Sequence, residues 1–176
     1  MWTPTVRRLV FLDESGVNIN LTRLYGRAPG AERVTDAIPL NKPKNTTILS
    51  SMRLDGSTAF TTCQGGTTGG KFLDYLKGTL IPTLHPGDIV VMDNLRTHHI
   101  EEVKNVLWEA KVSLMYLPAY SPDLNPIEMM WSKVKSILRA MKERTEEALA
   151  AAIKQAMEQI TPEDCMGWFR AAGYSC

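Results

Sequence analysis

The sequence predicts an α/β fold in which a mixed sheet of about five strands carries helices on both faces. Short apolar runs bounded by polar residues predict buried strands at 6–12, 88–92 and 113–117. Stretches with apolar residues at helical spacing separate the later runs, as in parallel strands joined by helices. The turn dipeptide Asp55-Gly56 predicts an antiparallel hairpin. With 176 residues and 44% hydrophobic content, the chain is expected to form one domain, residues 1–176, with a full core.

The first half of the chain is expected to supply the antiparallel strands. The segments 46–54 and 57–62 flank the turn dipeptide and form the two arms of the hairpin. Residues 17–44 alternate weakly in hydropathy and then become rich in glycine and proline, which favours a short hairpin followed by a loop. A glycine-rich stretch, 65–70, precedes a helix that the apolar spacing predicts over 68–80.

The second half is expected to be mainly helical. Thr97 is placed to cap a helix that ends near Ala110. Asn125 is expected to be the N-cap of a helix over 126–144, with proline at its first position and Glu128 at its third. The remaining helix signals are two N-caps and a stop: Thr145, Thr161 and Gly173.

Composition argues against several classes of protein. No apolar stretch reaches the roughly 18 residues of a membrane span and no secretory signal opens the chain, so we expect a cytoplasmic or nucleoid location and no membrane partner. The net charge of +1 does not decide for or against nucleic acid, since local clustering of basic residues matters more. The cysteines suggest neither a disulfide framework nor a zinc site, because they are few and far apart: Cys63, Cys165 and Cys176.

Three acidic residues are placed to share a divalent cation. Asp13 and Asp93 each follow an apolar run, and Glu128 begins a helix. Carboxylates from neighbouring strands and a helix can converge on one point and hold divalent cations together. Each residue also has an ordinary alternative, because an aspartate at a strand end often binds local backbone amides and a glutamate in a first helical turn often belongs to a capping box.

A basic stripe continues from Glu128 along the same helix. At about 100° per residue, Lys135, Arg139 and Lys142 lie within roughly 40° of Glu128, as does Ser132. Cations along this face suit the contact of DNA phosphates beside a metal site. The alternative is a solvated helix face.

Longer motifs around the three acids resemble a known family. They are Leu12-Asp13-Glu14-Ser15-Gly16, Val91-Met92-Asp93-Asn94 with His98-His99 after it, and Tyr120-Ser121-Pro122-Asp123-Leu124-Asn125-Pro126-Ile127-Glu128. Residues 94–127, an interval of 34, separate the second acid from the third. Together these features resemble the catalytic domain of the IS630/Tc1/mariner superfamily of DDE transposases. The similarity is greatest to bacterial IS630-type enzymes and covers nearly the whole chain.

The resemblance implies an RNase H-like fold and a catalytic, metal-binding triad of Asp13, Asp93 and Glu128. It implies two Mg²⁺ or Mn²⁺ ions, DNA strand cleavage, and strand transfer in which the resulting 3′-OH is the nucleophile on target DNA. The expected partners are transposon-end and target DNA, and a homodimer is common in the family. Family members usually carry N-terminal helix-turn-helix domains, which we expect to be absent here.

Five further predictions concern residues near the motifs. Asn94, His98 and His99 are close enough in sequence to Asp93 to contact DNA or the site, although structural roles are the alternative. Trp108 and Trp131 are expected to pack in the core.

Two other functions fit parts of the sequence. Gly65 to Lys71 matches most of a phosphate-binding loop of an NTPase, but Phe72 stands where a serine or threonine would bind Mg²⁺. A transposase fragment that binds DNA or other subunits without cutting is the second alternative.

Overall fold

The computed structural model describes residues 6–23, 25–30, 32–40, 43–93 and 100–176. Its centre is one five-stranded sheet in the order β3-β2-β1-β4-β5. The first three strands pair antiparallel, whereas β4 and β5 run parallel to β1. The predicted mixed sheet is confirmed. The strands are β1 Leu9–Val17, β2 Thr46–Arg53, β3 Thr58–Gln64, β4 Ile89–Met92 and β5 Ser113–Tyr116.

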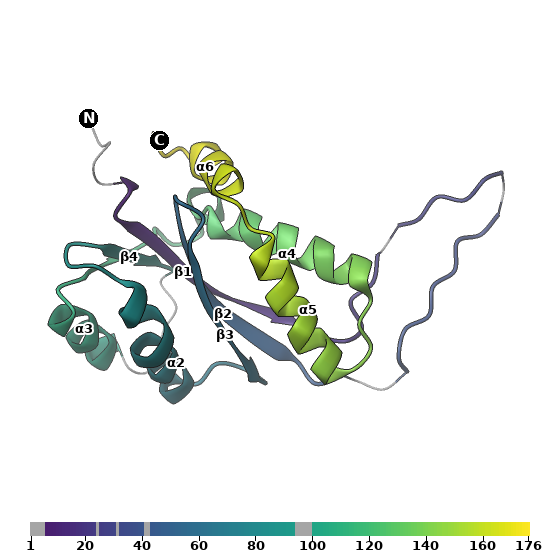
Figure 1. Ribbon diagram of the computed structural model, residues 1–176, viewed down its shortest axis with the longest axis horizontal. Helices are drawn as coiled ribbons and strands as arrows, with labels where there is room; N and C mark the ends of the chain where they lie inside the picture. Colours follow the sequence, from purple (N-terminus) through teal and green to yellow (C-terminus); the bar gives the residue numbers. More distant parts are fainter. Residues whose placement is uncertain (1–5, 24, 31, 41–42, 94–99) are drawn as a thin grey trace.

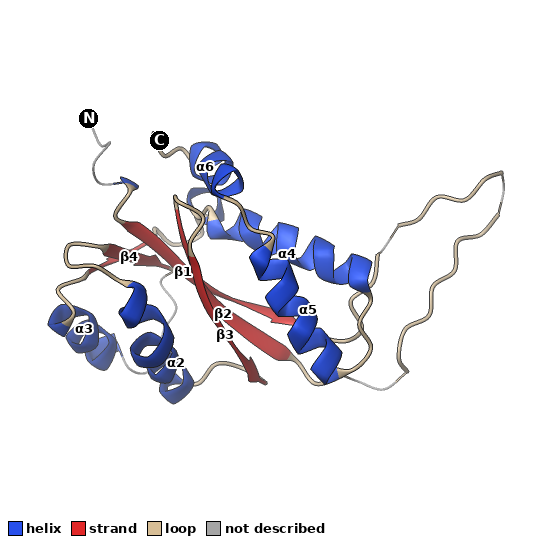
Figure 2. Ribbon diagram, in the orientation of Figure 1, coloured by secondary structure: helices blue, strands red, loops and turns tan. Residues whose placement is uncertain are grey.

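Helices cover both faces of the sheet, as predicted (Figures 1 and 2). One face packs against the C-terminal helices through the cluster that contains Phe11, Trp131 and Phe169. The other face packs against the earlier helices through the cluster that contains Leu12, Tyr75 and Leu107. The helices are α2 Gly69–Tyr75, α3 Ile100–Glu109, α4 Ile127–Met141, α5 Glu146–Glu158 and α6 Pro162–Ala171.

Turn and capping residues in the sequence correctly predicted most of these elements. The hairpin between β2 and β3 turns at Gly56, whose φ of 86° is readily adopted only by glycine. Thr145 caps α5, and Thr161 forms a capping box at the start of α6. The helix expected over 68–80 begins as α2 and continues as a π-helical segment, Leu76–Leu80.

The long connection between β1 and β2, residues 18–45, projects from the body of the molecule (Figure 1). Its described residues form neither strand nor helix, so the short hairpin predicted within 17–44 is wrong. Arg144, just before α5, holds the base of this connection by donating hydrogen bonds to backbone carbonyl oxygens of Ile19 (2.7 Å), Leu21 (3.1 Å) and Ala37 (3.2 Å). Hydrogen bonds from the Arg144 side chain thus hold this segment in place of the strand pairing that its alternating hydropathy predicted.

None of the helices in the described ranges is long and apolar enough to cross a membrane. All three cysteines are free thiols, as the sequence suggested.

Candidate active site

Asp13 lies on β1 and Asp93 directly follows β4, the parallel strand beside it, at the same level of the sheet. The register pairs Leu12 of β1 with Met92 of β4, and each aspartate is the next residue along its chain. The prediction that Asp13 ends its strand is wrong, because β1 continues to Val17. The strand tolerates polar residues beyond Leu12 since its antiparallel neighbour β2 pairs with it over that whole length.

Alternation along β1 directs Asp13 toward the helix that carries Glu128. Leu9 and Phe11 belong to the cluster beneath α4, and Asp13 follows them at the strand period of two. The indole Nε1–H of Trp131, from the second turn of α4, donates a 3.1 Å hydrogen bond to Asp13 Oδ2. Trp131 packs in the core as predicted, with 3% of its surface exposed, but nothing in the sequence pattern indicated that its N–H reaches Asp13.

Glu128 lies exposed in the first turn of α4 and shares a cavity of about 530 Å³ with Asp93. The loop before α4, residues 117–125, supplies most of the other wall. The predicted Asn125 cap is wrong: Pro126 holds the N-cap position and no side chain caps the helix. A proline has no N–H, so the reciprocal bond of a capping box from Glu128 to the N-cap amide cannot form. The capping alternative for Glu128 therefore loses its support.

Asn125 is itself unusual, because its side-chain oxygen Oδ1 is buried and accepts no hydrogen bond within the described part of the chain. The residue is 4% exposed and lines the cavity with Asp93 and Glu128. Buried carbonyl-type oxygens without a donor are rare in folded proteins, and they often mark a place where water or an ion binds.

The charges of Glu128 and Asp93 both act on the Asp13 carboxylate. Burial raises the pKa of Asp13 to about 6, and the nearby charges of Glu128 and Asp93 add to the increase. Two donors oppose it, the Trp131 indole and the backbone N–H of Glu14, which lies 2.8 Å from Asp13 Oδ1. A carboxylate whose pKa stays raised by burial and by negative neighbours, even with two donors, is one that a cation would stabilise.

The donor chemistry at this site suits a hard divalent cation. Carboxylate oxygens from Asp13, Asp93 and Glu128, with an amide oxygen from Asn125, are the ligand types that Mg²⁺ and Mn²⁺ prefer. Within the described ranges, however, no three acidic, histidine or cysteine side chains stand close enough together to hold a metal ion. The carboxylates would have to move closer to share one.

The basic stripe is shorter than the sequence suggested. Lys135 and Arg139 lie on α4, but the helix ends at Met141 and Lys142 follows it with a left-handed φ of 54°. The Lys142 ammonium lies 2.7 Å from Asp36 of the 18–45 connection, which occupies it with an intramolecular ion pair.

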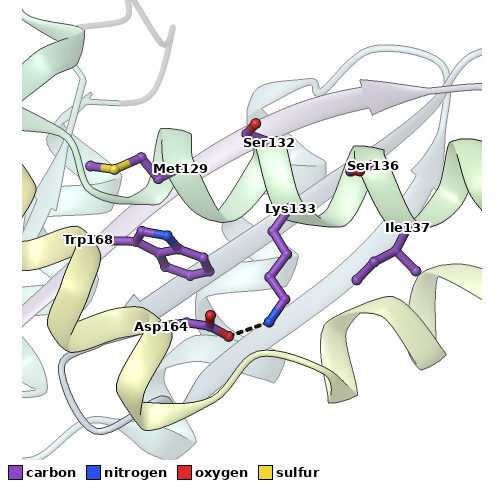
Figure 3. Close-up of a pocket in the computed structure, with 7 residues that line it drawn as sticks. All are labelled: Met129, Ser132, Lys133, Ser136, Ile137, Asp164 and Trp168. Atoms are coloured by element: carbon purple, nitrogen blue, oxygen red, sulfur yellow. Dashed lines mark hydrogen bonds and ion pairs between the residues drawn. The ribbon is translucent and has the colours of Figure 1, made fainter. Parts of the chain in front are cut away.

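A second hollow, of about 440 Å³, lies between α4 and α6 (Figure 3). Lys133 extends across it from α4 and forms an ion pair with Asp164 of α6, while Trp168 lies beside them. Lys133 also donates to the backbone oxygen of Gln159 at 2.9 Å. This lysine thus links the helices rather than adding to the basic stripe.

Other sequence predictions near the site have mixed outcomes. Trp108 is 82% exposed, so its predicted core position is wrong. The buried positions of α3 are Val103 and Leu107, four residues apart, and Trp108 lies about 100° around the helix from Leu107. Asn94, His98 and His99 lie outside the described residues, as does the expected cap Thr97.

The lysine that follows the glycine-rich stretch binds the backbone of that stretch and of the residue before it. Lys71 Nζ donates to the backbone oxygens of Gln64 at 2.7 Å and Gly66 at 3.2 Å. The lysine of a phosphate-binding loop would instead point to the nucleotide. This segment is therefore a turn that leads from β3 into α2.

Known proteins resemble this chain in sequence and in fold. A family model described as DDE superfamily endonuclease matches residues 8–150. The chain is similar to the transposable element Tcb1 transposase of Caenorhabditis briggsae, with 27% identity over 57% of this chain and 42% of the relative. It is also similar in structure to a Mos1 transposase paired-end complex with the left transposon end, at a TM-score of 0.77 and 17% identity. A Mos1 mariner paired-end complex with Mn gives a TM-score of 0.71, also at 17% identity.

The structural matches establish the fold of this chain, and the family model establishes its family. Each structural match covers 96% of this chain and 54% of the Mos1 chain, so this chain spans about half the length of those relatives. The likeness shows the RNase H-like fold that the sequence resemblance implied. The family model covers most of the chain, including all three acidic residues. The chain therefore belongs to the DDE superfamily of endonucleases.

Proposed function

We propose that this chain is the catalytic domain of a transposase that uses divalent metal to cleave DNA strands and then joins the resulting 3′ end to target DNA. In the joining step the 3′-OH attacks a target phosphodiester and the 3′ oxygen of the target strand leaves. The observation that carries the proposal is that Asp93 and Glu128 line one open cavity while the charges of both act on the partly buried carboxylate of Asp13. Acidic side chains gathered in this way suit a cation-dependent site.

Asp13, Asp93 and Glu128 would hold Mg²⁺ or Mn²⁺, and two ions are expected by analogy with the family. When bound, the metal supplies positive charge that stabilises the charge developing on the phosphate. Structures of Mos1 with Mn and with Mg support this assignment. The buried Oδ1 of Asn125 is a further oxygen that lies at the cavity wall.

DNA is the proposed partner, as transposon end and as target. Lys135 and Arg139, farther along α4 on the side that carries Glu128, are suited to contact backbone phosphates and hold a strand over the cavity. Asn94, His98 and His99 stay in the proposal on the sequence resemblance alone. Similar structures include a paired-end complex of Mos1 with the left transposon end and a Mos1 strand transfer complex, which supports DNA as the partner. A homodimer is proposed on the family resemblance.

A plasmid-nicking assay tests the proposal. The full chain, purified free of contaminating nucleases, is expected to convert supercoiled plasmid to the nicked form with Mn²⁺ or Mg²⁺ and to stop when EDTA is added. Mn²⁺ binding is measured on the same preparation by calorimetry. Absence of both nicking and metal binding would overturn the proposal. Metal binding without nicking, even with a transposon-end duplex, would favour the non-cutting fragment.

A further inference from the structure

Trp131 makes a polar contact that its place in the core does not require. Its Nε1–H lies 3.1 Å from Asp13 Oδ2, and the residue is almost completely buried. The contact joins residues 118 positions apart in sequence, one on β1 and one on α4. A buried indole N–H needs an acceptor, and a neutral backbone oxygen would meet that need. Here the acceptor is an acidic residue of the candidate site.

The Asp13 carboxylate is held from two sides. Oδ1 accepts the backbone N–H of Glu14 and Oδ2 accepts the Trp131 indole N–H. Each carboxylate oxygen can accept about two hydrogen bonds or metal contacts, so about one lone pair on each oxygen remains for a ligand. The two donors thus fix the plane of the carboxylate while leaving both oxygens able to bind.

The geometry points to Trp131 as a positioning residue, whose indole N–H orients the Asp13 carboxylate for a divalent cation. This inference rests on the function proposed above. Rigid burial makes the indole suited to the role, because a side chain locked by packing cannot swing its donor away. Trp131 also lies three residues after Glu128 on α4, so the same helix places one acidic residue and orients another.

Substitution of Trp131 tests the role of the donor. Trp131→Phe retains an aromatic ring but loses the N–H, and β-(3-benzothienyl)alanine at position 131 retains nearly the whole shape without the donor. Donors of this kind to metal ligands typically contribute about 10- to 100-fold in metal affinity. Both replacements are therefore expected to weaken Mn²⁺ binding by at least about tenfold, measured by calorimetry on the full chain. Trp108→Phe, on an exposed tryptophan of α3, is the matched control and is expected to leave binding unchanged.

A second measurement needs no metal. In the metal-free protein labelled with ¹⁵N at tryptophan, the Trp131 indole resonance is identified by its loss in Trp131→Phe. Asp13→Asn is expected to shift that resonance and to leave the Trp108 resonance in place. An unshifted Trp131 resonance, or equal Mn²⁺ affinity in wild type and both donor-free proteins, would overturn the positioning role. A wild-type chain that binds no Mn²⁺ while the indole resonance shifts as expected would instead overturn the proposed function and retain the contact.

Discussion

Glu128→Gln and Asp93→Asn are each expected to reduce metal-dependent DNA nicking by about a thousandfold, because each removes a charge from the metal site worth several kcal/mol in the transition state. The two substitutions keep side-chain size and differ from wild type mainly in charge. Both residues line the cavity and neither is in the core. Initial nicking rates at saturating Mn²⁺ measure the effect, and thermal unfolding confirms that each variant is folded.

Two matched substitutions control for the loss of any surface acid. Asp74→Asn lies on α2, which packs on the opposite face of the sheet, and Glu158→Gln lies at the end of α5, and both side chains are exposed. Neither is expected to change the nicking rate by more than about twofold, since exposed surface charges far from a site have small effects. A nicking rate that survives in Glu128→Gln and Asp93→Asn would mean that the catalytic assignment is wrong.

Asp13→Asn is expected to make the metal-free protein more stable at pH 8. The pKa of Asp13 is raised from 3.8 to about 6, so the folded state favours the protonated form and is penalised once the group ionises. The penalty is absent below pH 3.8, grows between pH 3.8 and about 6, and is complete above that. The shift corresponds to at most about 3 kcal/mol. The loss of one of the two donor contacts offsets part of this, so we expect a net gain of about 1 kcal/mol.

Thermal unfolding at several pH values measures this gain. For a chain of this size, about 1 kcal/mol corresponds to a rise in Tm of roughly 2–4 °C. The advantage of Asp13→Asn is expected at pH 8 in EDTA and to vanish toward pH 4. Saturating Mg²⁺ is expected to reverse the order, because only the wild type gains stability from bound metal. An equal Tm for the two proteins at every pH would show that Asp13 is not strained by its neighbours.

The sheet and its helices could be predicted from sequence because their signals are local. The Asp55-Gly56 turn fixes the β2–β3 hairpin, and threonine caps mark the starts of α5 and α6. Two of the acidic residues could be placed for a similar reason. Asp93 directly follows the apolar run of β4, and Glu128 lies two residues after Pro126, the N-cap of α4. Both positions could therefore be predicted from the ends of these elements.

The features that could not be predicted depend on long-range contacts. The apolar run stops before Asp13 and therefore predicts a strand end there. Pairing with β2 nevertheless continues β1 past Asp13 and past Ser15, which is buried. The Trp131 contact and the Arg144 anchor join residues more than 100 positions apart. The wrong prediction for Trp108 has a different cause, because the hydrophobicity of one residue does not determine which face of its helix packs against the sheet.

The prediction that Asn125 caps α4 failed for a local reason. Asn125-Pro126 matches a common N-cap and first-position pair, but Pro122–Leu124 form a 3₁₀ turn immediately before it. The Asn125 backbone N–H donates to Pro122 within that turn at 3.0 Å, and the helix begins one residue later than predicted. Asn125 is therefore not the helix cap, and Glu128 is not part of a capping box.

A crystal structure of the full chain soaked in Mn²⁺ tests the central claim most directly, with the ion located by its anomalous scattering. Among the described residues these carboxylates do not stand close enough together to share a metal, so the claim requires that a cation bring them within coordination distance. We predict anomalous density roughly 2.0–2.3 Å from oxygens of Asp13 and of at least one of Asp93 and Glu128. Density bound elsewhere, or an empty site at saturating Mn²⁺, would contradict a shared metal centre.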